Sequence, residues 1–146
     1  MPPVYPLVVV APEQQRNYRH MAKRDVAVWE RFLATHAAPF IGFSYDVALG
    51  GTRLQIEDAE EAHLLGWQYS TALKIDAVGW MGNQCWIIEV RPDATTSALG
   101  AALCYTLVAK REELTTLPLV PTVVCEAIQP DVQWACEQIG VQVVRV

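Results

Sequence analysis

Two carboxylates, Asp76 and Glu89, lie on either side of a Gly82-Asn83 pair in the segment IDAVGWMGNQCWIIEVR, residues 75–91. A hard divalent cation such as Mg²⁺ takes oxygen ligands and often uses only one or two carboxylates, completed by water and phosphate. A cation held in this way can activate water and stabilise the charge that develops during phosphodiester hydrolysis. The two residues are therefore candidate metal ligands of a hydrolytic site.

The Gly-Asn pair predicts where these carboxylates lie. Both residues tolerate the positive φ that a two-residue hairpin turn requires. A turn centred on them places Asp76 opposite Glu89 and Lys74 opposite Arg91. Because side chains alternate along a strand, all four charges are expected on one face of the hairpin.

Like charges directly opposite each other on neighbouring strands repel, so the two carboxylates need compensation. A divalent cation provides it in one interpretation. In the other, Lys74 and Arg91 neutralise Asp76 and Glu89 without any metal. The spacing of the residues leaves both interpretations open.

The motif and its surroundings resemble the PD-(D/E)XK nuclease superfamily, which has an αβββαβ core. The resemblance covers residues 20–146, with Asp76 matching the first carboxylate, Glu89 the second, and Arg91 standing where the family has lysine. The following segment SALGAALCY resembles the helix after the family's active site, and Ala101 falls where many members carry glutamine. The resemblance implies Mg²⁺ bound by Asp76 and Glu89, with Arg91 as the third catalytic group.

Two departures from the family pattern bear on activity. Lysine in this motif is thought to position or activate the attacking water, whereas arginine stays protonated and is a poor proton acceptor. Ala101 removes a further polar group from the pocket that the resemblance implies. From the sequence we therefore expect little or no nuclease activity with Mg²⁺ or Mn²⁺.

From VWERF through IIEV to the C-terminal strand, the chain is also similar to small uncharacterised proteins of tailed bacteriophages. This similarity implies a structural or assembly protein at the head–tail junction, neck or tail, with a degenerate nuclease-like fold as interaction scaffold. Other phage chains would then be its partners in an oligomeric assembly, in the virion and in the host cytoplasm during assembly, and no cofactor is expected. The alternative is an active Mg²⁺-dependent DNA nuclease in phage DNA processing or head completion. A basic-rimmed cleft beside Asp76 would favour a nuclease or DNA binder, and burial of that face would favour the scaffold.

Composition limits these readings. The chain has 146 residues, enough for one compact domain, and it is 52% hydrophobic but only 18% charged. So few charges suggest that a partner covers part of the surface. The net charge of −5 disfavours broad binding of nucleic acid and counts against a third reading, a non-catalytic nucleic-acid-binding regulator. No signal peptide or membrane span is expected, and the scattered Cys85, Cys104, Cys125 and Cys136 are expected to be reduced core thiols.

The pattern of apolar residues predicts an α/β (α+β) fold with a mixed β-sheet flanked by helices. Asp25 is expected to cap a first helix that turns Val28, Trp29, Phe32 and Leu33 inward. Strands are expected at residues 40–49, 68–80, 85–91, 117–127 and 141–146, with helices at 97–111 and 130–139. The first of these helices should turn Leu99, Ala102, Leu103, Leu107 and Val108 inward, while residues 52–66 stay ambiguous.

Residues 1–16 are expected to form an extended arm beside a single domain at 17–146, because prolines interrupt the arm. Its apolar residues are Val4, Tyr5, Leu7, Val8, Val9 and Val10, which can pack on their own domain or bind a partner. We take partner binding as the prediction. It implies that deletion of residues 1–12 leaves the main thermal transition unchanged but abolishes incorporation into an assembly.

Overall fold

The computed structural model describes residues 3–13 and 17–146. Its elements follow the chain as α1 (Lys23–His36), β1 (Gly42–Leu49), α2 (Glu61–Thr71), β2 (Leu73–Trp80), β3 (Cys85–Ala94), α3 (Thr96–Arg111), β4 (Leu119–Ile128), α4 (Pro130–Ile139) and β5 (Gln142–Arg145). Among the described residues, no helix has the length and apolar character needed to cross a bilayer.

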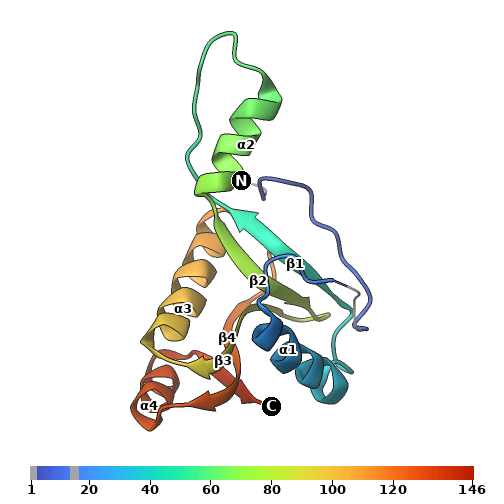
Figure 1. The fold of residues 1–146 in the computed structure, drawn as a ribbon, viewed down its shortest axis with the longest axis vertical. Coiled ribbons are helices and arrows are strands. Elements are labelled where there is room, and N and C mark those ends of the chain that lie inside the picture. The colour runs from blue at the N-terminus through green and yellow to red at the C-terminus, as the bar shows by residue number, and fades with distance from the viewer. Residues whose placement is uncertain (1–2, 14–16) are drawn as a thin grey trace.

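One mixed sheet organises the molecule, with the strands in the order β1-β2-β3-β4-β5. The first three strands form an antiparallel meander, and β3, β4 and β5 run parallel. Helices α3 and α4 provide the crossovers that parallel neighbours require. Helix α1 and helix α3 pack on opposite sides of the sheet (Figure 1). The predicted class, a mixed sheet flanked by helices, is confirmed.

Helix α2 is the main difference from the predicted elements. A strand was expected from residue 68, but the helix continues to Thr71 and β2 begins at Leu73. The inward residues Leu65 and Tyr69 are spaced for a helix and pack with Val4, Ala48 and Ala72. Together with the loop before it, α2 projects beyond the end of the sheet and has no fully buried residue (Figure 1).

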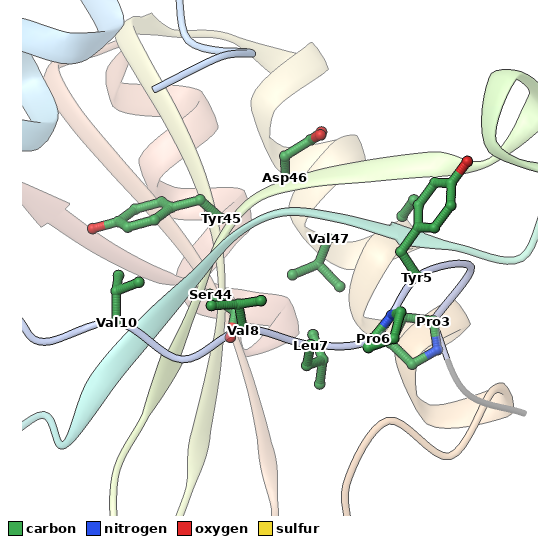
Figure 2. Close-up of a pocket in the computed structure, with 11 residues that line it drawn as sticks. Pro3, Tyr5, Pro6, Leu7, Val8, Val10, Ser44, Tyr45, Asp46 and Val47 are labelled. Atoms are coloured by element: carbon green, nitrogen blue, oxygen red, sulfur yellow. The ribbon is translucent and has the colours of Figure 1, made fainter. Parts of the chain in front are cut away.

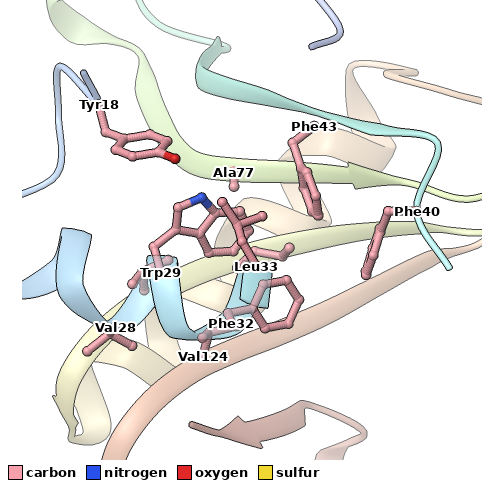
Figure 3. Packing of buried hydrophobic residues seen from close by; sticks show 11 residues of the cluster. Tyr18, Val28, Trp29, Phe32, Leu33, Phe40, Phe43, Ala77 and Val124 are labelled. Atoms are coloured by element: carbon pink, nitrogen blue, oxygen red, sulfur yellow. The ribbon is translucent and has the colours of Figure 1, made fainter. Parts of the chain in front are cut away.

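The first helix forms the core that its sequence predicts. Val28, Trp29, Phe32 and Leu33 are buried against the sheet. The Trp29 ring stacks on Phe32 at 4.8 Å between centroids (Figure 3). The indole Nε1 of Trp29 donates to the Tyr45 hydroxyl at 3.0 Å. Burial of these large rings accounts for the attachment of α1 to the sheet.

Asp25 is not the N-cap that was expected. The helix begins two residues earlier, Ala22 is its N-cap, and the Asp25 carboxylate accepts the Ala22 N–H at 3.1 Å. An acidic side chain in the first turn stabilises the helix end in this position too, because it faces the free N–H groups. The same placement brings Asp25 close to the candidate site.

The predicted inward face of α3 is only partly right. The helix buries Ala98, Ala102 and Ala109, whereas Leu107 is 60% exposed. The three alanines face the sheet and let the helix backbone approach it closely. In this orientation of the helix, Leu107 faces solvent. Three cysteines are buried free thiols as expected, but Cys104, on the outer side of α3, is exposed.

The described part of the arm, residues 3–13, lies along the outer edge of β1 (Figure 2). Val4 N–H donates to the Ala48 carbonyl at 3.0 Å, and Val10 exchanges two backbone hydrogen bonds with Phe43. Val4 is buried and Leu7 packs against the core, whereas Tyr5, Val8 and Val9 are exposed. The arm therefore contacts its own domain, and the exposed three remain available for the predicted partner.

Candidate active site

The hairpin has the predicted register. Ala77 pairs with Ile88 and Trp80 pairs with Cys85, on either side of the turn. The ladder ends at the Ala77–Ile88 pair, so Asp76 and Glu89 lie beside each other where the strands separate. There the Asp76 carboxylate accepts the Val90 N–H at 2.9 Å. The Asp76 side chain thus accepts the backbone N–H of Val90, which would have been available to β2 if the ladder had continued.

A third carboxylate comes from the neighbouring strand. On β1, Asp46 lies between Tyr45 and Val47, which pair with Ala77 and Ile75 of β2. This register places Asp46 beside Asp76 of β2. Both side chains line one small cavity. Asp46, Asp76 and Glu89 therefore form a row across three adjacent strands, an arrangement that concentrates negative charge.

The two outer carboxylates of this row have partners. Arg91 Nε and Nη2 each lie 2.7 Å from Glu89 Oε1. His20 Nε2 lies 2.6 Å from Asp46 Oδ2. In the part of the chain that the structure describes, Asp76 has no ion pair, and its hydrogen bond is the one from Val90.

Lys74 does not take the predicted place beside these carboxylates. Its ammonium donates to the carbonyl oxygens of Tyr69 at 2.7 Å and Ala72 at 3.2 Å, and it lies 4.6 Å from the Tyr69 ring centroid. The free carbonyls at the end of α2 attract a cation, and sequence-based assignment missed that this helix extends so far. The interpretation in which Lys74 and Arg91 together neutralise the acid pair is therefore wrong.

Both carboxyl groups of the pair have raised pKa values. Burial and the nearby Glu89 carboxylate raise the pKa of Asp76 to about 7, although the Val90 N–H opposes the rise. Burial also raises the pKa of Glu89, and the hydrogen bond from Arg91 offsets part of this effect. Partial burial lowers the pKa of Arg91, but the bond to Glu89 and both carboxylates raise it more, so the guanidinium stays protonated.

Asp76 and Glu89 open onto a cavity of about 570 Å³. Its wall contains a basic rim, which we define as Lys23, Arg24 and Arg91. The remaining lining residues are His20, Ala22, Asp25, Val90, Pro92 and Asp93. The exposed Arg24 and Asp93 lie 3.4 Å apart, so part of the rim is already paired. The cavity is open to solvent and combines buried carboxylates with cations, which suits a cation together with a phosphate.

Any metal here would have few protein ligands. Among residues 3–13 and 17–146, no group of three or more His, Cys, Asp or Glu is arranged to hold a metal ion. Asp76 and Glu89 alone would hold Mg²⁺, with the other positions left to water and phosphate, as is common for this ion. Asp76 is half-buried and forms no ion pair within the described part of the chain, which fits such an ion.

The sequence did not point to several residues around the cavity. Asp25 was expected only as a helix cap, and His20 was not among the candidate site residues. Tyr105 on α3 also lies within electrostatic range, because burial and then the Glu89 and Asp76 charges raise its pKa. Ala101 is one turn before Tyr105 and is partly buried. Only the chemistry of these residue types could have suggested them, since their sequence spacing carries no pattern.

Comparison with known proteins yields no relative. No family model matches the chain, and no curated protein or solved structure is significantly similar to it. The resemblances to PD-(D/E)XK nucleases and to small phage proteins therefore remain predictions from the sequence.

Proposed function

We propose that this protein is a divalent-cation-dependent DNA nuclease that acts in phage DNA processing or head completion. The observation that supports it is Asp76, a half-buried carboxylate beside Glu89 that forms no ion pair with any described residue and faces an open cavity. Burying like charges together is unfavourable, and a bound cation removes the cost. The basic rim beside the cavity is the feature that we expected of a nuclease or DNA binder rather than of a scaffold.

Each residue then has a role that follows from its chemistry. Asp76 and Glu89 hold the cation, which supplies an activated water and stabilises developing charge when it is bound. Arg91 keeps its charge and presents a planar fork, so it orients the scissile phosphate while it also contacts Glu89. Lys23 and Arg24 attract the DNA backbone locally. This local positive charge partly offsets the net charge of −5, which disfavours DNA binding by the protein as a whole.

A cleavage assay on linear and nicked duplex DNA, with Mg²⁺ or Mn²⁺, tests this proposal. The wild-type protein should cleave only with the metal, and both Asp76→Ala and Glu89→Ala should reduce cleavage to background. Arg91→Lys should preserve or raise the rate, since lysine restores a compact donor that can exchange a proton. Asp93→Asn is the matched control, because Asp93 lines the same cavity but is exposed. Metal-independent cleavage, or none at all, would contradict the proposal.

The second candidate is the phage scaffold without hydrolysis. Arg91 favours this candidate, because it forms an ion pair with Glu89 and cannot readily accept a proton. The exposed Val8, Val9 and Ile41 provide apolar surface for other phage structural chains in an oligomeric assembly. Mass spectrometry of purified phage particles tests this candidate. Stoichiometric amounts of the protein in the virion, together with an inactive wild-type protein, would favour the scaffold over the nuclease.

A further inference from the structure

Asp46 has an unusual backbone for a residue inside a strand. Its φ is 50°, in the left-handed region that residues other than glycine rarely adopt. The surrounding strand β1 continues its pairing with β2 on both sides of this residue. Strain of this kind persists where the rest of the structure enforces it and is concentrated at functional sites. Asp46 points to the opposite side of β1 from Val47 (Figure 2).

The Asp46 carboxylate holds His20 in one orientation. Asp46 Oδ2 accepts from His20 Nε2 at 2.6 Å and from the Tyr69 hydroxyl at 2.7 Å. A carboxylate on one ring nitrogen fixes the tautomer, so the proton of neutral His20 lies on Nε2 and Nδ1 is left as an acceptor. His20 also lines the cavity that contains Asp76 and Glu89.

We propose that His20, positioned by Asp46, accepts the proton of the attacking water in this cavity. The inference rests on the proposed function and extends it, because Arg91 of the candidate site stays protonated and cannot readily serve as a proton acceptor. The His20–Asp46 pair supplies a neutral acceptor from a different strand and a different part of the chain. Asp46 is the positioning residue of this pair.

The step balances with water as the only co-reactant. The water oxygen forms a bond to phosphorus, its proton passes to His20 Nδ1, and the bond from phosphorus to the leaving ester oxygen breaks. The leaving oxygen takes a proton from solvent, and His20 returns its proton to solvent afterwards. Asp46 keeps its charge throughout and stabilises the imidazolium that forms transiently.

Charged and titratable groups surround His20 from several elements. They are Tyr18 and Arg19 before it in the chain, Lys23, Arg24 and Asp25 of α1, Tyr45 and Asp46 of β1, Tyr69 of α2, Asp76 of β2, and Glu89, Arg91 and Asp93 of β3. Because burial and Glu89 raise the pKa of Asp76 to about 7, rates are to be compared at saturating Mg²⁺. Under that condition a difference between variants reports on His20.

Single-turnover cleavage by His20→Gln is the main test. Glutamine retains an N–H donor toward Asp46 but has no basic nitrogen, so the fold should persist. We expect the rate to fall by about 10²–10⁴-fold, with DNA affinity in Ca²⁺ unchanged. A wild-type rate that increases with pH as the general base loses its proton should become independent of pH in this variant. Asp46→Asn should lower the rate less, and His63→Gln, at an exposed histidine, should match the wild type.

A second measurement does not depend on cleavage. Nitrogen-15 NMR of the imidazole rings, with His20→Gln used to assign the signal, should show His20 protonated on Nε2. Addition of a short DNA duplex in Ca²⁺ should shift this signal and leave the signal of His63 in place.

The outcomes separate the two proposals. An inactive wild-type protein contradicts the proposed function, whereas a wild-type rate in His20→Gln with an active wild type overturns this inference alone. A proton on Nδ1 in the free protein would also overturn it, whether or not the protein cleaves DNA. A lower melting temperature of His20→Gln with an unaltered rate would assign the pair a structural role only.

Discussion

Asp76→Asn is expected to stabilise the protein at pH 8 and to have little effect at pH 4.5. Folding raises the pKa of Asp76 from its ordinary value of 3.8 to about 7. Between pH 3.8 and about pH 7 the native protein holds a proton on Asp76 that the unfolded chain has lost. The free energy of unfolding therefore falls as the pH rises through this range. Above pH 7 both states are ionised and the native state carries the full cost of a buried charge.

Asparagine removes that charge and keeps an oxygen that can accept the Val90 N–H. The free energy of unfolding should therefore increase by up to about 4 kcal/mol at pH 8, since the pKa rises from 3.8 to about 7 and each unit of pKa is about 1.4 kcal/mol. Urea unfolding at the two pH values measures it. Asp93→Asn, at an exposed carboxylate of the same cavity, should change stability by less than about 0.5 kcal/mol. Equal stability of Asp76→Asn and wild type at pH 8 would show that another group already neutralises Asp76.

Added cation gives an independent check on the same carboxylate. At pH 8, millimolar Ca²⁺ or Mg²⁺ should raise the melting temperature of the wild-type protein, because an ion that binds only the native state stabilises it. The same addition should have little effect on Asp76→Asn. Stabilisation of both proteins to the same extent would place the ion elsewhere.

What the sequence predicted correctly depends on local rules. The Gly82-Asn83 turn and the two-residue period were sufficient to place Asp76 beside Glu89, because hairpin register depends on nearby residues. Helical spacing likewise identified Trp29 and its neighbours as core. Element boundaries were less certain where the apolar pattern fits both a helix and a strand. Residues 68–71 were assigned to a strand but belong to the end of α2.

The rest of the site depends on contacts between distant segments. Lys74 leaves the hairpin because the end of α2 offers it carbonyl oxygens, which is visible only once that helix is known. His20 reaches Asp46 through the path of the chain between the arm and α1. Aspartate tolerates a positive φ better than most residues, but its type alone does not single out position 46. A metal-free neutral quartet was therefore a reasonable reading of the spacing, and three-dimensional packing was needed to exclude it.

Deletion of residues 1–12 is now expected to destabilise the domain, in contrast to the unchanged transition predicted from the sequence. The deletion removes the buried Val4, the packed Leu7 and the hydrogen bonds of Val4 and Val10 to β1. Loss of this burial should lower the free energy of unfolding by about 2–5 kcal/mol. It also uncovers the edge of β1, so the truncated protein should self-associate more readily in size-exclusion chromatography.

Point substitutions separate packing on the domain from binding of a partner. Val4→Ala should lower the melting temperature, whereas Val8→Ala, at a side chain that is 68% exposed, should not.

Gly42→Ala should resemble the deletion, because its new methyl group would overlap the Val10 carbonyl and lie 2.8 Å from Val9 Cγ1. Gly100→Ala, with no neighbouring heavy atom within 4 Å, controls for the exchange itself. If deletion and Gly42→Ala both leave the transition unchanged, the arm contributes nothing to its own domain. Loss of particle incorporation in Val8→Ala at full stability would instead assign the exposed side of the arm to a partner, because that substitution leaves the buried contacts intact.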